Sequence, residues 1–171
     1  MTSQSDPLSQ RVERVKNSVR QLPTAAASLN SATDQLGASV AQLDAVLKKF
    51  SLGVPTWVPF NQSSADSVPE YYREEIGYAK VGGKWGIAIR TIEGTYQSPD
   101  DDEVEQWLFN DAPRLLRVNA VEKIADLLDA LIEKAAEMTK TITQKTAEVD
   151  ALAAGIKSVV EPAFGPKASK R

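Results

Sequence analysis

Two long stretches of the chain repeat apolar residues at alternating spacings of four and three, and this pattern constrains the fold more than any other feature. Such a heptad repeat predicts an α-helix whose apolar stripe packs against another helix. The first repeat spans residues 7–50, with leucine at most places of one set and β-branched or small residues at most places of the other. The two sets are Leu8, Val15, Leu22, Leu29, Leu36, Leu43 and Phe50, and Val12, Val19, Ala26, Thr33, Val40 and Leu47.

Capping residues mark the ends of this first helix. Asp6 and Pro7 suit a helix start, because Asp caps the first turn and proline fits the first helical position. Gly53 and Pro55 suit its end. Pro23 lies inside the repeat, where proline removes a backbone hydrogen bond and costs about 3 kcal/mol. We therefore expect either a kink near Pro23 or two helices that meet there end to end.

A second heptad repeat of matching length lies in residues 112–160, and residues 161–171 are expected to form a flexible tail. The matching lengths predict an antiparallel coiled-coil hairpin, joined at one end by the residues in between. Lys145 alone interrupts its two sets, which are Val121, Leu128, Ala135, Ile142, Val149 and Ile156, and Ile124, Leu131, Met138, Lys145, Leu152 and Val159.

Residues beside the repeats predict self-association. A polar residue within a repeat, such as Thr33 or Lys145, can fix register and oligomeric state, although a lysine can also extend its charge to solvent. A lone two-helix coiled coil usually has charged flanks. Here the flanks are small or apolar, which favours a homo-oligomer in which two hairpins form a four-helix arrangement. They include Ala25, Ala32, Gly37, Ser39, Ala120, Ala125, Leu127, Ile132, Ala153, Gly155 and Val160.

Residues 76–109 between the repeats predict a small β-meander. Residues 76–81 and 84–94 alternate around Gly82-Gly83, a pair suited to the positive φ angles of a two-residue hairpin turn. That turn would place Tyr78 opposite Ile87 on a bulky face, with small residues such as Gly77 on the other. Residues 103–109 suit a third strand. The expected fold class is α+β and mainly α: a single elongated domain over residues 1–171, with about three antiparallel strands inserted between two long helices.

Residues 51–75 are predicted to be a long loop, and loops of that length are usually functional. Its aromatic residues include Trp57 and Phe60. One interpretation is that they cover the sheet, since aromatic side chains tend to be buried. The other is that they anchor a protein partner, since aromatic residues are favoured at interfaces.

Composition excludes many catalytic classes. The chain of 171 residues contains neither Cys nor His, which removes disulfides, Cys and His metal sites and the usual nucleophile–histidine pairs. Its net charge of −3 predicts no general attraction to nucleic acid or to acidic membranes. No apolar run is long enough to span a membrane, and the N-terminus lacks the apolar segment of a signal peptide. The default expectation is a cytoplasmic protein.

Two short motifs suggest chemistry but fit it poorly. The sequence "KVGGKW" contains Gly-Lys, as phosphate-binding loops do, yet Tyr78 and Trp85 stand where that motif needs Gly and Ser or Thr. The sequence "SPDDDEVE" places consecutive acids at residues 100–103, and consecutive acids lack the ligand spacing of a calcium loop. We therefore expect a solvated acidic loop, with no metal site and no cofactor.

The outline of helix, small sheet and helix is similar to that of prefoldin-like chaperone subunits, which also join two coiled-coil helices through β-hairpins. This similarity concerns the fold and transfers no function. The architecture favours a non-enzymatic protein–protein interaction module, such as an oligomeric scaffold, adaptor or chaperone-like subunit. Its predicted partner-binding residues are Trp57, Phe60, Tyr78, Trp85 and Ile87.

The alternative is a module, enzymatic or not, that binds a small molecule or anion in a pocket between the sheet and the helices. Arg90, Arg114 and Arg117 would form the anion-binding cluster, since arginine suits carboxylates and phosphates. The simpler interpretation of these arginines is pairing with nearby acids such as Asp111 and Glu122. No catalytic residue is predicted.

Overall fold

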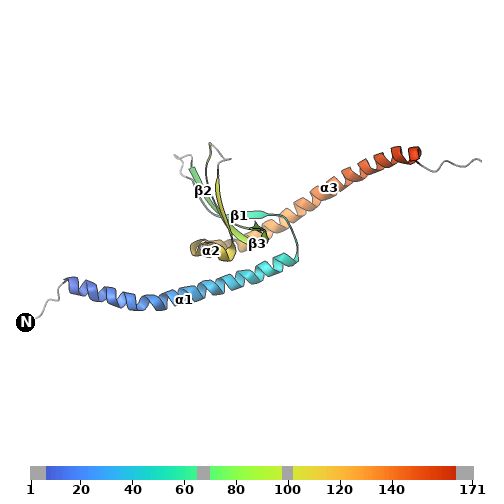
Figure 1. Ribbon diagram of the computed structural model, residues 1–171. Helices are drawn as coiled ribbons and strands as arrows, with labels where there is room; N and C mark the ends of the chain where they lie inside the picture. The colour runs from blue at the N-terminus through green and yellow to red at the C-terminus, as the bar shows by residue number, and fades with distance from the viewer. Residues whose placement is uncertain (1–6, 65–69, 98–101, 165–171) are drawn as a thin grey trace, which may run out of the picture.

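The computed structural model describes residues 7–64, 70–97 and 102–164 and confirms an α+β fold that is mostly helical. Two long helices flank an antiparallel sheet along the chain (Figure 1). The elements are α1 (Pro7–Lys49), β1 (Thr56–Ser64), β2 (Glu70–Val81), β3 (Lys84–Thr95), β4 (Glu103–Leu108), the 3-10 turn η2 (Phe109–Asp111), α2 (Arg114–Ala120), the 3-10 turn η3 (Val121–Lys123) and α3 (Ile124–Phe164).

The central hairpin has the predicted register. β2 and β3 pair so that Tyr78 faces Ile87 and Val81 faces Lys84. The turn between them has two residues, Gly82 at φ 56° and Gly83 at φ 84°. Both angles lie in the left-handed region that only glycine enters at little cost. The pairing of the hairpin therefore follows from its turn residues, as the sequence predicts.

The sheet has four strands in the order β1-β2-β3-β4, so the expectation of about three was wrong. β1 and the first part of β2 lie in residues 51–75, which were expected to form a loop. Proline and a run of polar residues weaken the strand signal of β1, but an edge strand tolerates proline. The pairing of β1 with β2 shifts at a bulge between Pro59 and Asn61, which lets a proline-containing segment join the sheet.

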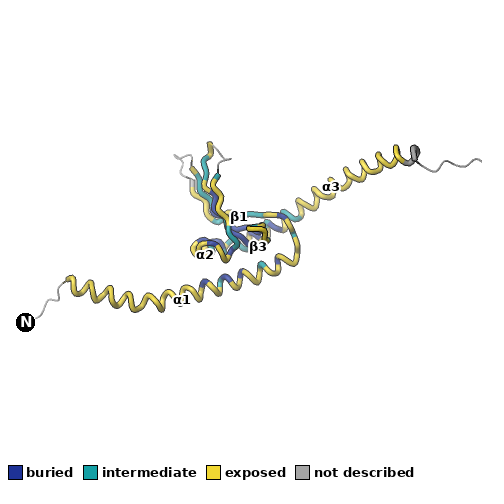
Figure 2. The backbone as a smooth tube through the Cα atoms, viewed as in Figure 1, coloured by how far each residue is buried: buried dark blue, intermediate teal, exposed yellow. Residues whose placement is uncertain are grey.

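The hydrophobic core lies between the bulky face of the sheet and parts of the helices. Ile76 and Ile89 are fully buried at the centre of that face. They belong to one buried cluster with residues from the second half of α1, from α2 and from the first part of α3, namely Val40, Leu47, Leu116, Ala120, Leu127 and Leu131. Figure 2 shows that burial is concentrated around the sheet.

The two long helices begin and end close to the predicted residues. α1 is one uninterrupted helix through Pro23, so two separate helices do not form. The predicted second helix, residues 112–160, is divided by η3, although the backbone keeps helical angles at Ala120, Val121 and Ile124. α3 also continues to Phe164, past the predicted end, and the rest of the expected tail lies outside the described residues.

The predicted antiparallel pairing of the two long helices within one chain is not confirmed. In Figure 1, α1 approaches the sheet from one side and α3 leaves it on the other. The chain crosses the sheet between them, and α2 and the start of α3 pack on the bulky face, so the far ends of the two helices point away from each other. The repeats at those far ends therefore do not meet within the chain.

Candidate functional site

The main candidate surface is formed by the parts of the two long helices that project beyond the sheet. We define the α1 arm as residues 7–32, before the first buried residue of α1, and the α3 arm as residues 136–164, after the last partly buried residue of α3. Every described side chain of both arms is exposed, as Figure 2 shows. By their residue numbers the arms have nearly equal length, about 40 Å at 1.5 Å per residue.

The exposed side chains of the arms include the heptad residues. Leu22 on the α1 arm is 61% exposed and Val149 on the α3 arm is 62% exposed. Isolated exposed apolar residues are ordinary, but a continuous stripe marks an interaction surface. The exposed stripe residues are Leu8, Val12, Val15, Val19, Leu22 and Leu29 on α1, and Met138, Ile142, Val149, Leu152, Ile156 and Val159 on α3.

Nearer the sheet, the same repeats are covered by the chain itself. Val40 and Leu47 of α1 and Leu131 of α3 belong to the core cluster. The two polar residues of the repeats also differ in setting. Thr33 is buried and its hydroxyl donates a 2.7 Å hydrogen bond to the Leu29 carbonyl, whereas Lys145 is exposed and forms a 2.8 Å ion pair with Glu148 of the same helix.

Three of the predicted partner-binding residues lie on the core face of the central hairpin. Tyr78 and Ile87 are buried within the chain. Trp85 is half-buried, and its ring stacks on Tyr78 with 5.6 Å between ring centroids. Burial raises the pKa of Tyr78, since the phenolate is less well solvated there. In the single chain, therefore, only Trp85 of these three offers an accessible surface.

The other two, Trp57 and Phe60, lie on β1 at the edge of the sheet. Phe60 packs against the core cluster. Trp57 pairs with Gly77, and its indole occupies the space that a side chain at Gly77 would need. The Arg90 guanidinium lies 4.3 Å from the centroid of the Trp57 ring and forms a 2.6 Å ion pair with Glu75. The small-residue face that was predicted to receive another backbone is therefore covered in part by Trp57.

The predicted arginine cluster is not assembled. Arg90 follows the buried Ile89 in β3, and successive side chains of a strand point to opposite faces of the sheet. Arg90 therefore lies on the face opposite the core and α2. Arg114 on α2 donates a 2.7 Å hydrogen bond to the Asn30 side chain of α1. The Nε of Arg117 is buried without a hydrogen-bond partner. The three side chains thus have three separate environments.

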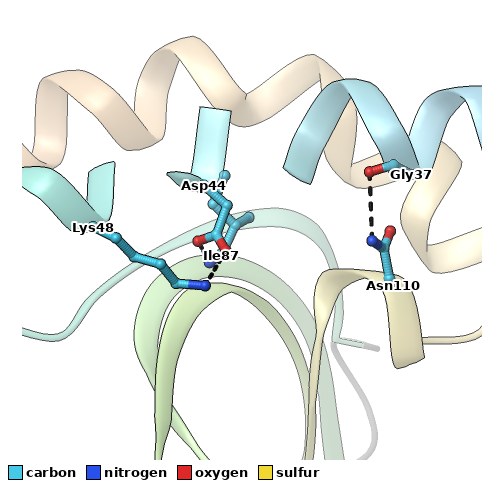
Figure 3. A network of polar contacts seen from close by, with 5 residues as sticks. All are labelled: Gly37, Asp44, Lys48, Ile87 and Asn110. Carbon is cyan, nitrogen blue, oxygen red and sulfur yellow. Dashed lines mark hydrogen bonds and ion pairs between the residues drawn. The ribbon is translucent and has the colours of Figure 1, made fainter. Parts of the chain in front are cut away.

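The sequence did not reveal the polar junction between α1 and the sheet (Figure 3). The Asp44 carboxylate accepts a 2.9 Å hydrogen bond from the Ile87 backbone N–H and forms a 2.6 Å ion pair with Lys48. Asn110 donates a 3.4 Å hydrogen bond to the Gly37 carbonyl. Asp44 stands beside the heptad repeat, where acids commonly face solvent, so no local signal distinguished it.

A second feature that the sequence did not reveal is a cavity of about 220 Å³ at the far end of the sheet, lined by Gln62, Tyr71, Arg73 and Tyr96. The Tyr71 hydroxyl donates a hydrogen bond to the Asp102 carboxylate, and this bond raises the pKa of Tyr71. Asp102 belongs to the predicted acidic loop, of which residues 100 and 101 lie outside the described residues. Within the described ranges, no cluster of three or more acidic side chains could hold a metal ion.

Comparison with known proteins adds no family to these observations. No protein family, curated protein or solved structure matches the chain. None of the helices in the described part of the chain is both long and apolar enough to cross a membrane.

Proposed function

We propose that the protein is a non-enzymatic protein–protein interaction module, an oligomeric coiled-coil scaffold or adaptor with a chaperone-like outline. One observation carries this proposal: the heptad stripes of the α1 and α3 arms are exposed along their whole described length. A heptad stripe is the surface that pairs helices in coiled coils. The arms would supply reach and self-association, and the sheet would supply a docking surface.

The energetics of the arms favour a partner. Burying one Leu or Val side chain contributes about 1.5–3 kcal/mol, and each arm presents a series of them. Without packing of an apolar face, helices of moderate length are only marginally stable in water. Association of the arms would both stabilise the helices and remove the apolar stripes from water.

The docking role proposed for the sheet depends on residues that remain accessible. Trp85 at the hairpin and Trp57 on the outer face are half-buried, so each has exposed area for a partner. Aromatic side chains held in place by their neighbours make good interface anchors. Trp57 is held by Arg90 and Trp85 by Tyr78.

The alternative, binding of an anion or small molecule, has less support. Its three arginines are dispersed, and Arg90 is already paired with Glu75. The cavity beside Arg73 is a different candidate, and its small volume suits only a small ligand. Thermal-shift measurements with phosphate and dicarboxylates test this alternative, and stabilisation by any of them would favour it.

Light scattering on a gel-filtration column, over a range of concentrations, tests the interaction module. The wild-type chain is expected to form a dimer or a larger species. The double variant Leu22→Lys and Val149→Lys places charges in both stripes and should shift the mass toward the monomer. Thr24→Lys with Ala147→Lys is the matched control, because these exposed residues lie on the outer faces of the same arms. A monomeric wild-type chain would contradict self-association.

A further inference from the structure

We infer that the partner of each arm is the other arm of a second copy: the α1 arm of one chain pairs antiparallel with the α3 arm of its neighbour, and the reverse pair forms at the other end. This inference rests on the proposed self-association and names its geometry. It moves the antiparallel helix pairing that the sequence predicts from within one chain to between two chains.

The directions of the two long helices favour this pairing. α1 runs toward the sheet and α3 runs away from it on the opposite side (Figure 1). A second copy related by a two-fold axis through the sheet region would reverse both directions. Its α1 arm would then lie on the side of the first chain's α3 arm and run the opposite way. Two-fold dimers use the same patch on both copies, so one arrangement covers all four arms.

The heptad positions of the two arms also match in an antiparallel pair. In an antiparallel coiled coil, residues from the two heptad sets face each other in layers. If Leu22 faces Val149, every stripe residue of the α1 arm from Val12 to Leu29 faces a stripe residue of the α3 arm, because the two repeats have the same period. In this register the polar exception, Lys145, faces Ala26, and the small alanine leaves room for the lysine stem to reach solvent.

The net charges of the arms disfavour pairing of two like arms. The α1 arm has four basic residues and one acidic residue, for a net charge of +3. The α3 arm has three basic and four acidic residues, for a net charge of −1. Two α1 arms or two α3 arms would bring together like net charges, whereas one of each brings together opposite charges.

Cysteine crosslinking tests the pairing cleanly, because the natural chain contains no cysteine. Leu22→Cys and Val149→Cys are made as two separate single variants, mixed under denaturing conditions, refolded together and oxidised. The expected result is a crosslinked dimer in the mixture and none above background in either variant alone. Thr24→Cys mixed with Ala147→Cys is the matched control on the outer faces and should not crosslink.

Each other outcome overturns the inference in a recognisable way. Crosslinking of Leu22→Cys alone would indicate pairing of two α1 arms. A crosslinked monomer of the double variant Leu22→Cys, Val149→Cys would indicate a hairpin within one chain. If light scattering shows a dimer but the mixture does not crosslink with cysteine at Ile142, Val149 or Ile156, which span one heptad on either side, the inference fails while the proposed function stands. A monomer by light scattering overturns both.

Discussion

The Asp44 carboxylate of α1 accepts a 2.9 Å hydrogen bond from the Ile87 backbone N–H of β3. In a continuous sheet, a carbonyl of the neighbouring strand would accept this bond. β4 pairs with β3 only as far as Ala88 opposite Leu108, and the chain then turns into η2. Beyond that point the N–H of Ile87, which faces away from β2, lacks a strand partner. A helix side chain thus completes the edge of the sheet and joins α1 to it.

Replacing Asp44 should loosen this junction. Asp44→Ala removes the acceptor of a part-buried N–H, and an unsatisfied group of this kind costs about 1–3 kcal/mol. Asp44→Asn keeps an acceptor oxygen and should cost less. Urea unfolding followed by tryptophan fluorescence measures the difference, because all three tryptophans lie in strands. Asp34→Ala on the exposed surface of the same helix is the control. An equal cost for the Asp34 and Asp44 alanine variants would contradict this role.

Gly77 should not tolerate a side chain. A Cβ there would lie 2.3 Å from the Trp57 ring and 2.5 Å from the Thr56 carbonyl oxygen. Gly77→Ala is therefore expected to destabilise the protein by about 1–3 kcal/mol, the usual cost of overpacking, and to displace β1. Gly155→Ala on the α3 arm has no neighbour within 4 Å and should instead favour the helix by about 0.5–1 kcal/mol. Thermal unfolding of both variants gives the comparison, and equal effects would refute it.

The Arg90–Glu75 pair predicts strong coupling. Glu75 is 8% exposed at its side chain and Arg90 is 26% exposed. Removing Arg90 leaves a buried carboxylate unpaired, which costs about 3 kcal/mol or more. Arg90→Ala should therefore be much less costly in a Glu75→Gln background. A double-mutant cycle on the free energy of unfolding measures the coupling. Additive effects of the two substitutions would show that the two side chains do not stabilise each other.

The raised pKa of Tyr72 in β2 predicts a loss of stability at high pH. Burial and a hydrogen bond to Glu74 raise the pKa of Tyr72 to about 12, from an ordinary value of 10.0. The folded state therefore holds this proton more tightly than the unfolded state. Its stabilising contribution is complete below about pH 10 and is lost as the pH rises toward 12. Unfolding experiments from pH 9 to about 12 check this, with Tyr72→Phe as the variant that should lose part of the pH dependence. An unchanged dependence in Tyr72→Phe would assign it to other groups.

Hydrogen exchange should divide the helices into two parts. Amides in residues 34–47 of α1 lie where the helix packs on the sheet and should be protected at every protein concentration. Amides of the α1 and α3 arms should exchange faster at low concentration and become protected as association proceeds, since arm helicity would depend on pairing. Protection that is equal and independent of concentration would contradict association through the arms.

Much of the local structure could be predicted from the sequence. The bounds of α1 follow from its heptad repeat and from Pro7, which suits the first helical position. Asp6, the predicted cap, lies outside the described residues. The register of β2 and β3 follows from Gly82 and Gly83, because a two-residue turn leaves one way to pair the flanking residues. β1 could not be predicted, since Pro59 and its polar neighbours have low strand propensity and the strand exists through its pairing with β2.

The candidate sites were predicted less well. Tyr78 and Ile87 were identified as one bulky face, but a bulky face reads the same whether it binds a partner or forms the core. The three arginines were grouped by their distance along the chain, and the alternation of β3 places Arg90 on the opposite face from α2. Asp44 carries no pattern, because its role depends on where β4 ends.

The sequence by itself determined which residues form helices and where the chain turns, since periodicity, capping and glycine φ angles act over a few residues. Only the tertiary structure decided what covers each heptad stripe. A stripe requires an apolar partner but does not specify which one. Near the sheet, Val40 and Leu131 are buried within the chain. Leu22 and Val149 belong to the same two repeats but stay exposed, because the two helices extend from the sheet in opposite directions.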